Sequence, residues 1–286
     1  MHLDRIDLAD IHAPRAIAQA VHKQLGEIEP PVPVISIAKA LDITEICTQR
    51  FYGFEGMLLT DRVRSRGSIL ANTKRGNRRA RFTIAHELGH FLIERHKLFG
   101  PTGFLCSAQD MRETRKAQMH MRQEREANQF AINLLAPPSL FDALLSQDPE
   151  LKDAQQLRDH LNVSLEAVIR HLVERRPECL AAVWSKDGHI RYWVSGDGFP
   201  WITCKRGERL SSLSVASKIV AKSSGEFSTF VDTNPIAWTN RSNIELFEQT
   251  RLSPSGHAVT LLWADVPDED DNDNGGLYEL SAPKFR

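Results

Sequence analysis

The sequence has few cysteines, and none of them belongs to a Cys-x-x-Cys pair. The four are widely scattered, at Cys47, Cys106, Cys179 and Cys204. A thiolate zinc site uses cysteines paired at short spacing, so the sequence argues against this class of metal site. Isolated cysteines fit a reducing compartment, where thiols stay reduced. We expect these side chains to act as small packing residues.

The sequence also lacks a strong charge of either sign and a long apolar run. Its 36 Lys and Arg nearly balance its 37 Asp and Glu, which gives a net charge of −1. No global basic field would therefore hold nucleic acid, and direct DNA binding would need a local patch. Residues 1–7 carry no apolar signal-peptide core, and no segment reaches the roughly 18 apolar residues of a membrane span. These features predict a cytoplasmic location and no membrane partner.

The five residues His86-Glu87-Leu88-Gly89-His90 are the most informative motif. Two histidines four apart on a helix project from one face, so both imidazoles can reach one cation. The carboxylate of Glu87 would lie beside that cation, where it could accept a proton from water whose pKa zinc lowers to about 7. Apolar residues at helical spacing around the motif place it on a buried helix. The motif predicts a zinc-dependent hydrolase with Glu87 as general base.

Gly89 is an unfavourable residue inside this helix. It costs roughly 1 kcal/mol relative to alanine, and the common reason to accept it is close approach of another backbone. We expect that neighbour to be the edge of a sheet or the next helix.

A third metal ligand is expected from the next helical segment, residues 123–135, which contains two glutamates. At about 100° per residue, Glu124 lies about 50° from the centre of the apolar stripe and Glu126 about 110° away. Glu124 therefore faces the core and is the preferred ligand, with Glu126 as the alternative. The alternative for Glu124 is a purely structural role, in which the helix dipole favours its negative charge at the N-terminal end of the helix. Asn128, one turn beyond, could hydrogen-bond a ligating histidine or be exposed.

The segments around these residues resemble the ImmA/IrrE metallopeptidases. The resemblance is carried by Arg81–Leu92, which contains the His-Glu-x-x-His motif, by Glu124–Ala131 and by Leu134–Pro137. The family often has Met where this chain has Ala136, a difference with no evident effect on metal binding. The resemblance implies a gluzincin-like site in which His86, His90 and Glu124 bind zinc, or manganese in its place, and Glu87 is the general base.

Members of this family cleave Xre-type helix-turn-helix repressors and so relieve repression under stress. The resemblance therefore implies that this protein is an endopeptidase with such a repressor as substrate and partner. The alternative is a regulator that binds the repressor or DNA without cleavage and keeps the zincin fold as a scaffold. The intact Glu87 favours the enzyme, because a scaffold needs no general base.

The predicted fold class is α+β, with four parts along the chain. Residues 1–145 form a zincin-like metallopeptidase domain, 146–178 a helix-turn-helix-like segment, 179–265 an α/β domain and 266–286 an acidic, flexible tail. The α/β assignment follows strand-like segments 180–184, 189–194 and 258–263. This order of parts is similar to that of longer IrrE-like members, whose C-terminal domain is GAF-like.

Several shorter segments of the first domain have expected structures. Helices are predicted over 15–25 and 34–41, and strands over 56–60 and 67–72. The strand 67–72 could hold an extended substrate at a sheet edge or lie buried inside the sheet. The basic cluster 74–81 is expected to be a solvated loop, with docking of an acidic partner or DNA as the alternative. Residues 97–120 are predicted to form a long loop that could line or cover the active-site cleft. His120 and Tyr52 are weaker candidates for stabilising the oxyanion or the leaving group.

Two later segments allow a functional and a structural interpretation. The helices predicted over 151–161 and 164–175 have a helix-turn-helix pattern, but their mixed charges favour a structural connector over a DNA-reading element. The acidic stretch 265–274 matches part of an EF-hand loop, yet Ser281 stands where the bidentate glutamate belongs. A flexible linker or tail is the favoured interpretation.

Overall fold

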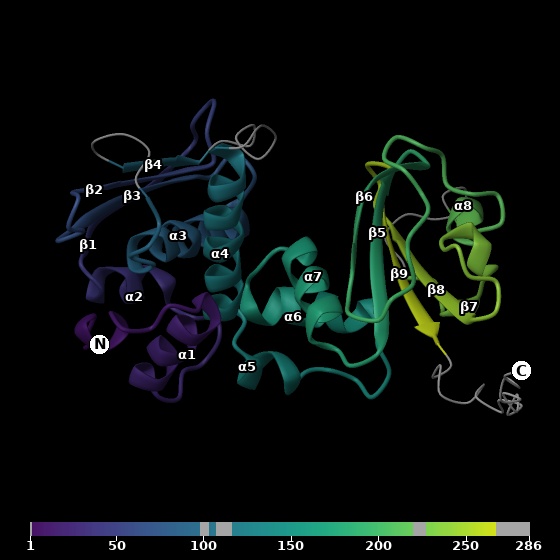
Figure 1. Cartoon of the computed structure of the whole chain (residues 1–286), viewed down its shortest axis with the longest axis horizontal. Coiled ribbons are helices and arrows are strands. Elements are labelled where there is room, and N and C mark those ends of the chain that lie inside the picture. The colour runs from purple at the N-terminus through teal and green to yellow at the C-terminus, as the bar shows by residue number, and fades with distance from the viewer. Residues whose placement is uncertain (1, 98–102, 107–115, 220–226, 267–286) are drawn as a thin grey trace, which may run out of the picture. The chain divides into compact units, whose positions relative to one another are not determined.

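The computed structural model describes residues 2–97, 103–106, 116–219 and 227–266. The chain forms two compact units, Met1–Arg175 and Arg176–Arg286 (Figure 1). Within the described residues both units combine helices with a sheet, so the predicted α+β class is confirmed.

The first unit contains a four-stranded sheet in the order β1-β3-β2-β4. Its strands are β1 (Ile43–Gln49), β2 (Gly56–Thr60), β3 (Gly67–Asn72) and β4 (Gly103–Cys106). Strand β3 runs parallel to β1 and antiparallel to β2, and β2 is antiparallel to β4. The strands predicted over 56–60 and 67–72 have the expected bounds. Of the two alternatives for 67–72, burial inside the sheet is correct, because β1 covers the other side of β3.

Seven helices and one 3-10 turn complete the described part of this unit. They are η1 (Ile6–Leu8), α1 (Pro14–Leu25), α2 (Val34–Ala40), α3 (Asn77–Leu92), α4 (Lys116–Leu135), α5 (Pro138–Asp142), α6 (Leu151–Leu161) and α7 (Leu165–Arg175). Helix α3 packs on β2 and β3, and α4 packs on α3 and α1. The loop predicted over 74–81 is wrong from Asn77 onward, where α3 begins. The loop predicted over 97–120 is likewise interrupted by β4 and ends at α4.

Gly89 sets how closely α3 and α4 approach. A Cβ atom at this position would lie 2.9 Å from Cδ1 of Phe130 and 3.3 Å from Cα of Ala127, both on α4. Phe130 and Ala127 are fully buried. The predicted close neighbour is therefore the next helix rather than a sheet edge.

Helices α6 (Leu151–Leu161) and α7 (Leu165–Arg175) form the pair predicted from the helix-turn-helix pattern. Asn162 ends α6 in the left-handed conformation, with φ 52° and ψ 48°. Arg78 of α3 donates to Asp159 at 2.8 Å and to Asn162 at 3.2 Å. These bonds attach the end of α6 to the helix that carries the motif, as a structural connector requires.

The second unit contains an antiparallel five-stranded sheet in the order β6-β5-β9-β8-β7. Its elements are β5 (Cys179–Lys186), β6 (His189–Ser195), α8 (Ala216–Ile219), β7 (Val231–Asp232), η2 (Pro235–Ala237), β8 (Glu245–Leu252) and β9 (His257–Asp265). The three predicted strands are present and extend beyond their expected ends. Of the acidic stretch 265–274, residues 267–274 lie outside the described residues.

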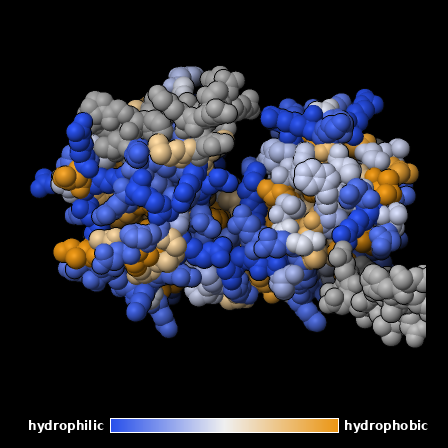
Figure 2. Space-filling view, viewed as in Figure 1, coloured by the Kyte–Doolittle hydropathy of each residue, from blue (hydrophilic) through white to orange (hydrophobic). Residues whose placement is uncertain are grey.

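The surface of the described residues is mainly hydrophilic on the face seen in Figure 2, where apolar residues form small separate groups. Among the described residues, no helix combines the length and the apolar character that crossing a bilayer requires.

Glu248 is a buried carboxylate in the core of the second unit. Its Oε2 accepts a hydrogen bond from Nε1 of Trp238 at 2.6 Å, and its Oε1 accepts from the backbone N–H of Ala216 at the start of α8. Both Glu248 and Trp238 are almost completely buried. Burial raises the pKa of Glu248, although the hydrogen bonds from Trp238 and Ala216 oppose this shift.

The raised pKa predicts a pH-dependent stability of the second unit. Above the ordinary value of 4.5, folded Glu248 retains a proton that the unfolded chain has released. Its contribution to the free energy of unfolding therefore falls as the pH rises from 4.5 through the raised pKa. Chemical denaturation of wild type and Glu248→Gln across this range should show wild type losing stability relative to the variant. Glu245→Gln, exposed on the same strand, is the control; a pH-independent difference for Glu248→Gln would contradict the prediction.

Enlarging Gly89 should separate α3 from α4. We expect Gly89→Val to lower the free energy of unfolding by about 1–3 kcal/mol, because the side chain has no room against Phe130. The exposed helical substitution Lys152→Val controls for the helix propensity of valine. Denaturant titration measures both variants, and equal losses in the two would show that the close approach has no energetic role.

Candidate metal centre

Three side chains from α3 and α4 converge on one buried point. The Nε2 atoms of His86 and His90 lie 3.1 Å apart. Glu124 places Oε2 3.3 Å from Nε2 of His86 and Oε1 3.1 Å from Nε2 of His90. Each of the three residues is buried, and their ligand atoms lie within 4.8 Å of one another. The structure thus brings together the three residues expected to bind a metal.

The spacing of these atoms fits a tetrahedral cation site. Bonds of about 2.1 Å from zinc to imidazole nitrogen and carboxylate oxygen would separate neighbouring ligands by about 3.4 Å. The separations of 3.1 to 3.3 Å are close to that value. Two imidazoles and one carboxylate leave one tetrahedral position open, which is the arrangement of a catalytic site. His86, His90 and Glu124 could therefore hold zinc or a similar divalent ion.

The charges at this point favour a cation. Burial raises the pKa of Glu124, but the contacts with His86 and His90 outweigh burial and hold it well below its usual range. Burial lowers the pKa of His90 to about 3, so this imidazole is neutral at pH 7. For His86, burial lowers the pKa, whereas Glu124 and Glu87 raise it and prevail. The carboxylates of Glu124 and Glu87 beside the two imidazoles therefore favour the binding of a positive ion.

Glu87 is fully buried beside the three residues, one position after His86. Strand β2 approaches it at Gly56, where a Cβ atom would overlap both Oε1 of Glu87 and the methyl group of Thr83. Gly56 is therefore required for space rather than for backbone conformation. The sheet and α3 together confine the carboxylate that the sequence predicts to be the general base.

Asn128 of α4 orients the ring of His86. Its Oδ1 lies 3.0 Å from Nδ1 of His86. An amide oxygen can only accept, so Nδ1 carries a proton, which leaves Nε2 as the nitrogen of His86 that can bind a metal ion. This is the contact that the hydrogen-bonding alternative for Asn128 predicted.

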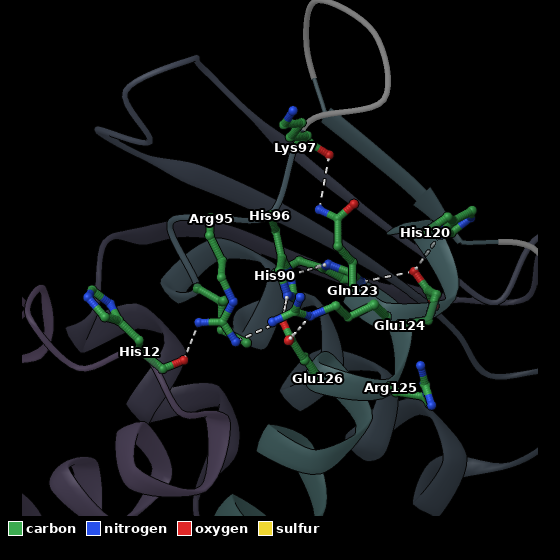
Figure 3. A network of polar contacts seen from close by, with 12 residues as sticks. His12, His90, Arg95, His96, Lys97, His120, Gln123, Glu124, Arg125 and Glu126 are labelled. Atoms are coloured by element: carbon green, nitrogen blue, oxygen red, sulfur yellow. Dashed lines mark hydrogen bonds and ion pairs between the residues drawn. The ribbon is translucent and has the colours of Figure 1, made fainter. Parts of the chain in front are cut away.

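The other candidate residues occupy different places. Glu126, the alternative ligand, contacts His96, Arg95 and Arg122 instead of the trio. His120 lies 3.5 Å from Glu124 through Nδ1, at the edge of the site (Figure 3). Tyr52 is 83% exposed, under the ammonium group of Lys74.

Sequence reasoning missed His96. This residue is only 2% exposed, and its Nδ1 lies 2.9 Å from Nδ1 of His90. It follows the motif by six positions in a turn, without helical periodicity. In the sequence, only its position six residues after His90 could have drawn attention to it.

Comparison with known families identifies the domain that carries this site. The model of the IrrE N-terminal-like domain matches residues 46–173, which include all four predicted site residues. Residues 46–173 are an IrrE N-terminal-like domain of the ImmA/IrrE family. The predicted resemblance is confirmed. The family is one of metal-dependent peptidases and also includes regulators, so the IrrE-like domain is of a metallopeptidase kind.

Among solved structures, the chain is similar to a Mycobacterium tuberculosis transcriptional regulator. The two share 14% sequence identity with a TM-score of 0.56, over 91% of this chain and 80% of that chain. At this identity the likeness establishes a shared fold. No curated protein matches the chain.

A side chain at position 56 should displace the carboxylate of Glu87, the predicted general base. In Gly56→Ala the added methyl group competes with the Glu87 carboxylate and Thr83 for space. We expect hydrolysis to fall about 10- to 100-fold while zinc affinity stays near the wild-type value, since the ligands lie on other elements. Leu59→Ala, at an exposed position of the same strand, is the control. Full activity in Gly56→Ala would show that the position of Glu87 tolerates the methyl group.

Proposed function

We propose that this protein is a zinc-dependent endopeptidase that cleaves an Xre-type helix-turn-helix repressor and so relieves repression under stress. The convergence of His86, His90 and Glu124 beside the buried Glu87 carries the proposal. The match of residues 46–173 to a metallopeptidase family supports the reaction type. Manganese is the second candidate for the metal.

The proposed chemistry assigns one role to each residue. His86, His90 and Glu124 hold the cation, which when bound polarises the scissile carbonyl and lowers the pKa of water. The Glu87 carboxylate accepts a proton from the water that attacks the carbonyl carbon. It then delivers this proton to the amide nitrogen as the C–N bond breaks, and the products are a carboxylic acid and an amine.

Strand β4 is the proposed docking strand for the substrate. Among the described strands it is the edge strand next to β2, and its Cys106 pairs with Gly56, the residue that confines Glu87. Backbone groups on the outer side of an edge strand can pair with an extended peptide. An unfolded segment of the repressor bound there would pass close to the general base.

The second unit is proposed as the regulatory part. We propose that its five-stranded sheet belongs to the expected GAF-like domain of residues 179–265. The tail expected over 266–286 lies, from residue 267 onward, outside the described residues. Sensing or partner binding would fit this assignment.

Incubation with the repressor encoded beside the gene tests the proposed reaction. Wild type loaded with zinc or manganese should cleave it at a single region, detected by mass spectrometry of the products. Glu87→Gln should bind zinc as wild type does and cleave at least about 100-fold more slowly, because only the general base is lost. Glu124→Gln should lose zinc as well as activity.

The outcomes separate the two candidate functions. Full-length repressor after incubation with metal-loaded wild type would contradict the protease. If the uncleaved repressor were nevertheless bound, the protein would be a non-cleaving regulator instead of a protease.

A further inference from the structure

A row of buried polar groups runs from His90 away from the metal centre. Nδ1 of His90 lies 2.9 Å from Nδ1 of His96, and Nε2 of His96 lies 2.9 Å from Oε2 of Glu126 (Figure 3). The side chain of His96 is fully buried, and that of Glu126 is 14% exposed. The row joins the motif helix α3, the turn that follows it and α4.

The far end of this row is a carboxylate held by two arginines. Arg95 lies 2.9 Å from Oε2 of Glu126, and Arg122 donates to Oε1 at 2.9 Å. Two guanidinium groups stabilise the charged form, so Glu126 accepts hydrogen bonds and donates none.

The turn that carries His96 is held by a further arginine. Arg64, on the β2–β3 connection, donates to the backbone oxygens of Phe91 at 3.3 Å and Ile93 at 2.6 Å, and also to that of His96. These bonds occupy carbonyl groups at the C-terminal end of α3. Arg64 is itself 8% exposed, so the backbone of His96 is fixed from inside the fold.

The acceptor role of the Glu126 carboxylate determines where each proton in the row lies. Because Glu126 only accepts, Nε2 of His96 must carry a proton. A neutral His96 then has a lone pair on Nδ1, which accepts the proton on Nδ1 of His90. The remaining nitrogen of His90, Nε2, is left with a lone pair that points at Glu124, 3.1 Å from Oε1.

We propose that His96 and Glu126 are positioning residues that set the tautomer of His90 so that its Nε2 receives a metal ion rather than a proton. A lone pair on Nε2 facing the Glu124 carboxylate is repulsive unless a cation lies between them. The row therefore raises the affinity of the centre for a metal. The inference rests on the proposed metal site, but it requires neither the peptidase reaction nor the repressor.

Zinc affinity of the purified full chain, measured by competition with a chromophoric chelator at neutral pH, tests this role. His96→Leu should weaken zinc binding by about 10- to 100-fold, as loss of a partner to a ligating histidine does. His96→Asn should restore most of the affinity, because its Oδ1 can accept from His90 where Nδ1 of His96 did. Glu126→Gln keeps an acceptor without the charge, and its loss should be smaller than that of His96→Leu.

His171→Leu is the matched control, since His171 is a buried histidine of α7 packed on Phe141 outside the centre. It should leave zinc affinity unchanged. Equal weakening in His96→Leu, His96→Asn and His171→Leu would show a general effect of packing and overturn the proposal. Wild type that binds no zinc would overturn it together with the metal site, whereas zinc binding without repressor cleavage would overturn only the peptidase.

The tautomer of His96 gives a readout that packing alone does not change. In the zinc-loaded protein, nitrogen NMR of the imidazoles should show His96 neutral with its proton on Nε2, and His90 with a proton on Nδ1. A proton on Nδ1 of His96 would overturn the proposal, because that nitrogen could then not accept from His90. Circular dichroism of each variant confirms that the fold is retained.

Discussion

The contact between α3 and α4 is the constraint on which the site depends. Two ligands lie on one helix and the third on the other, so the three ligand atoms meet only if the helices approach closely. Gly89 permits this approach because a side chain there would collide with Phe130. The same contact brings Asn128 to His86. Glycine inside a helix costs about 1 kcal/mol relative to alanine. The close approach that the site needs explains why glycine is found at this position.

The residues of the candidate site followed from helical periodicity to a large extent. The four-residue spacing of His86 and His90 fixes their common face whatever the fold, and the angle of Glu124 to the apolar stripe separates it from Glu126. His96 could not be found in this way. Its place depends on a turn held by Arg64, and that contact brings together residues 32 positions apart. Tertiary contacts of this kind leave no periodic pattern in the sequence.

The same limit explains which strands were predicted. Strands β2 and β3 are short apolar segments bounded by turn residues, whereas a register shift between Ile43 and Glu45 hides the alternation of β1. Strand β8 was missed because it buries Glu248, Gln249 and Thr250, which read as surface residues. The sequence left open whether β3 lies at the edge or inside the sheet for a related reason: the strand that covers its outer side, β1, was not recognised. Sheet order depends on partners distant in sequence, which local propensity does not specify.

The central claim is that His86, His90 and Glu124 bind one metal ion. X-ray absorption spectroscopy of the zinc-loaded protein tests it most directly, because it reports the type and number of ligand atoms independently of catalysis. The structure predicts nitrogen and oxygen neighbours at about 2.0–2.1 Å, with the scattering pattern of two imidazole rings and no sulfur. A sulfur shell at about 2.3 Å, or a single imidazole, would contradict this account of the site.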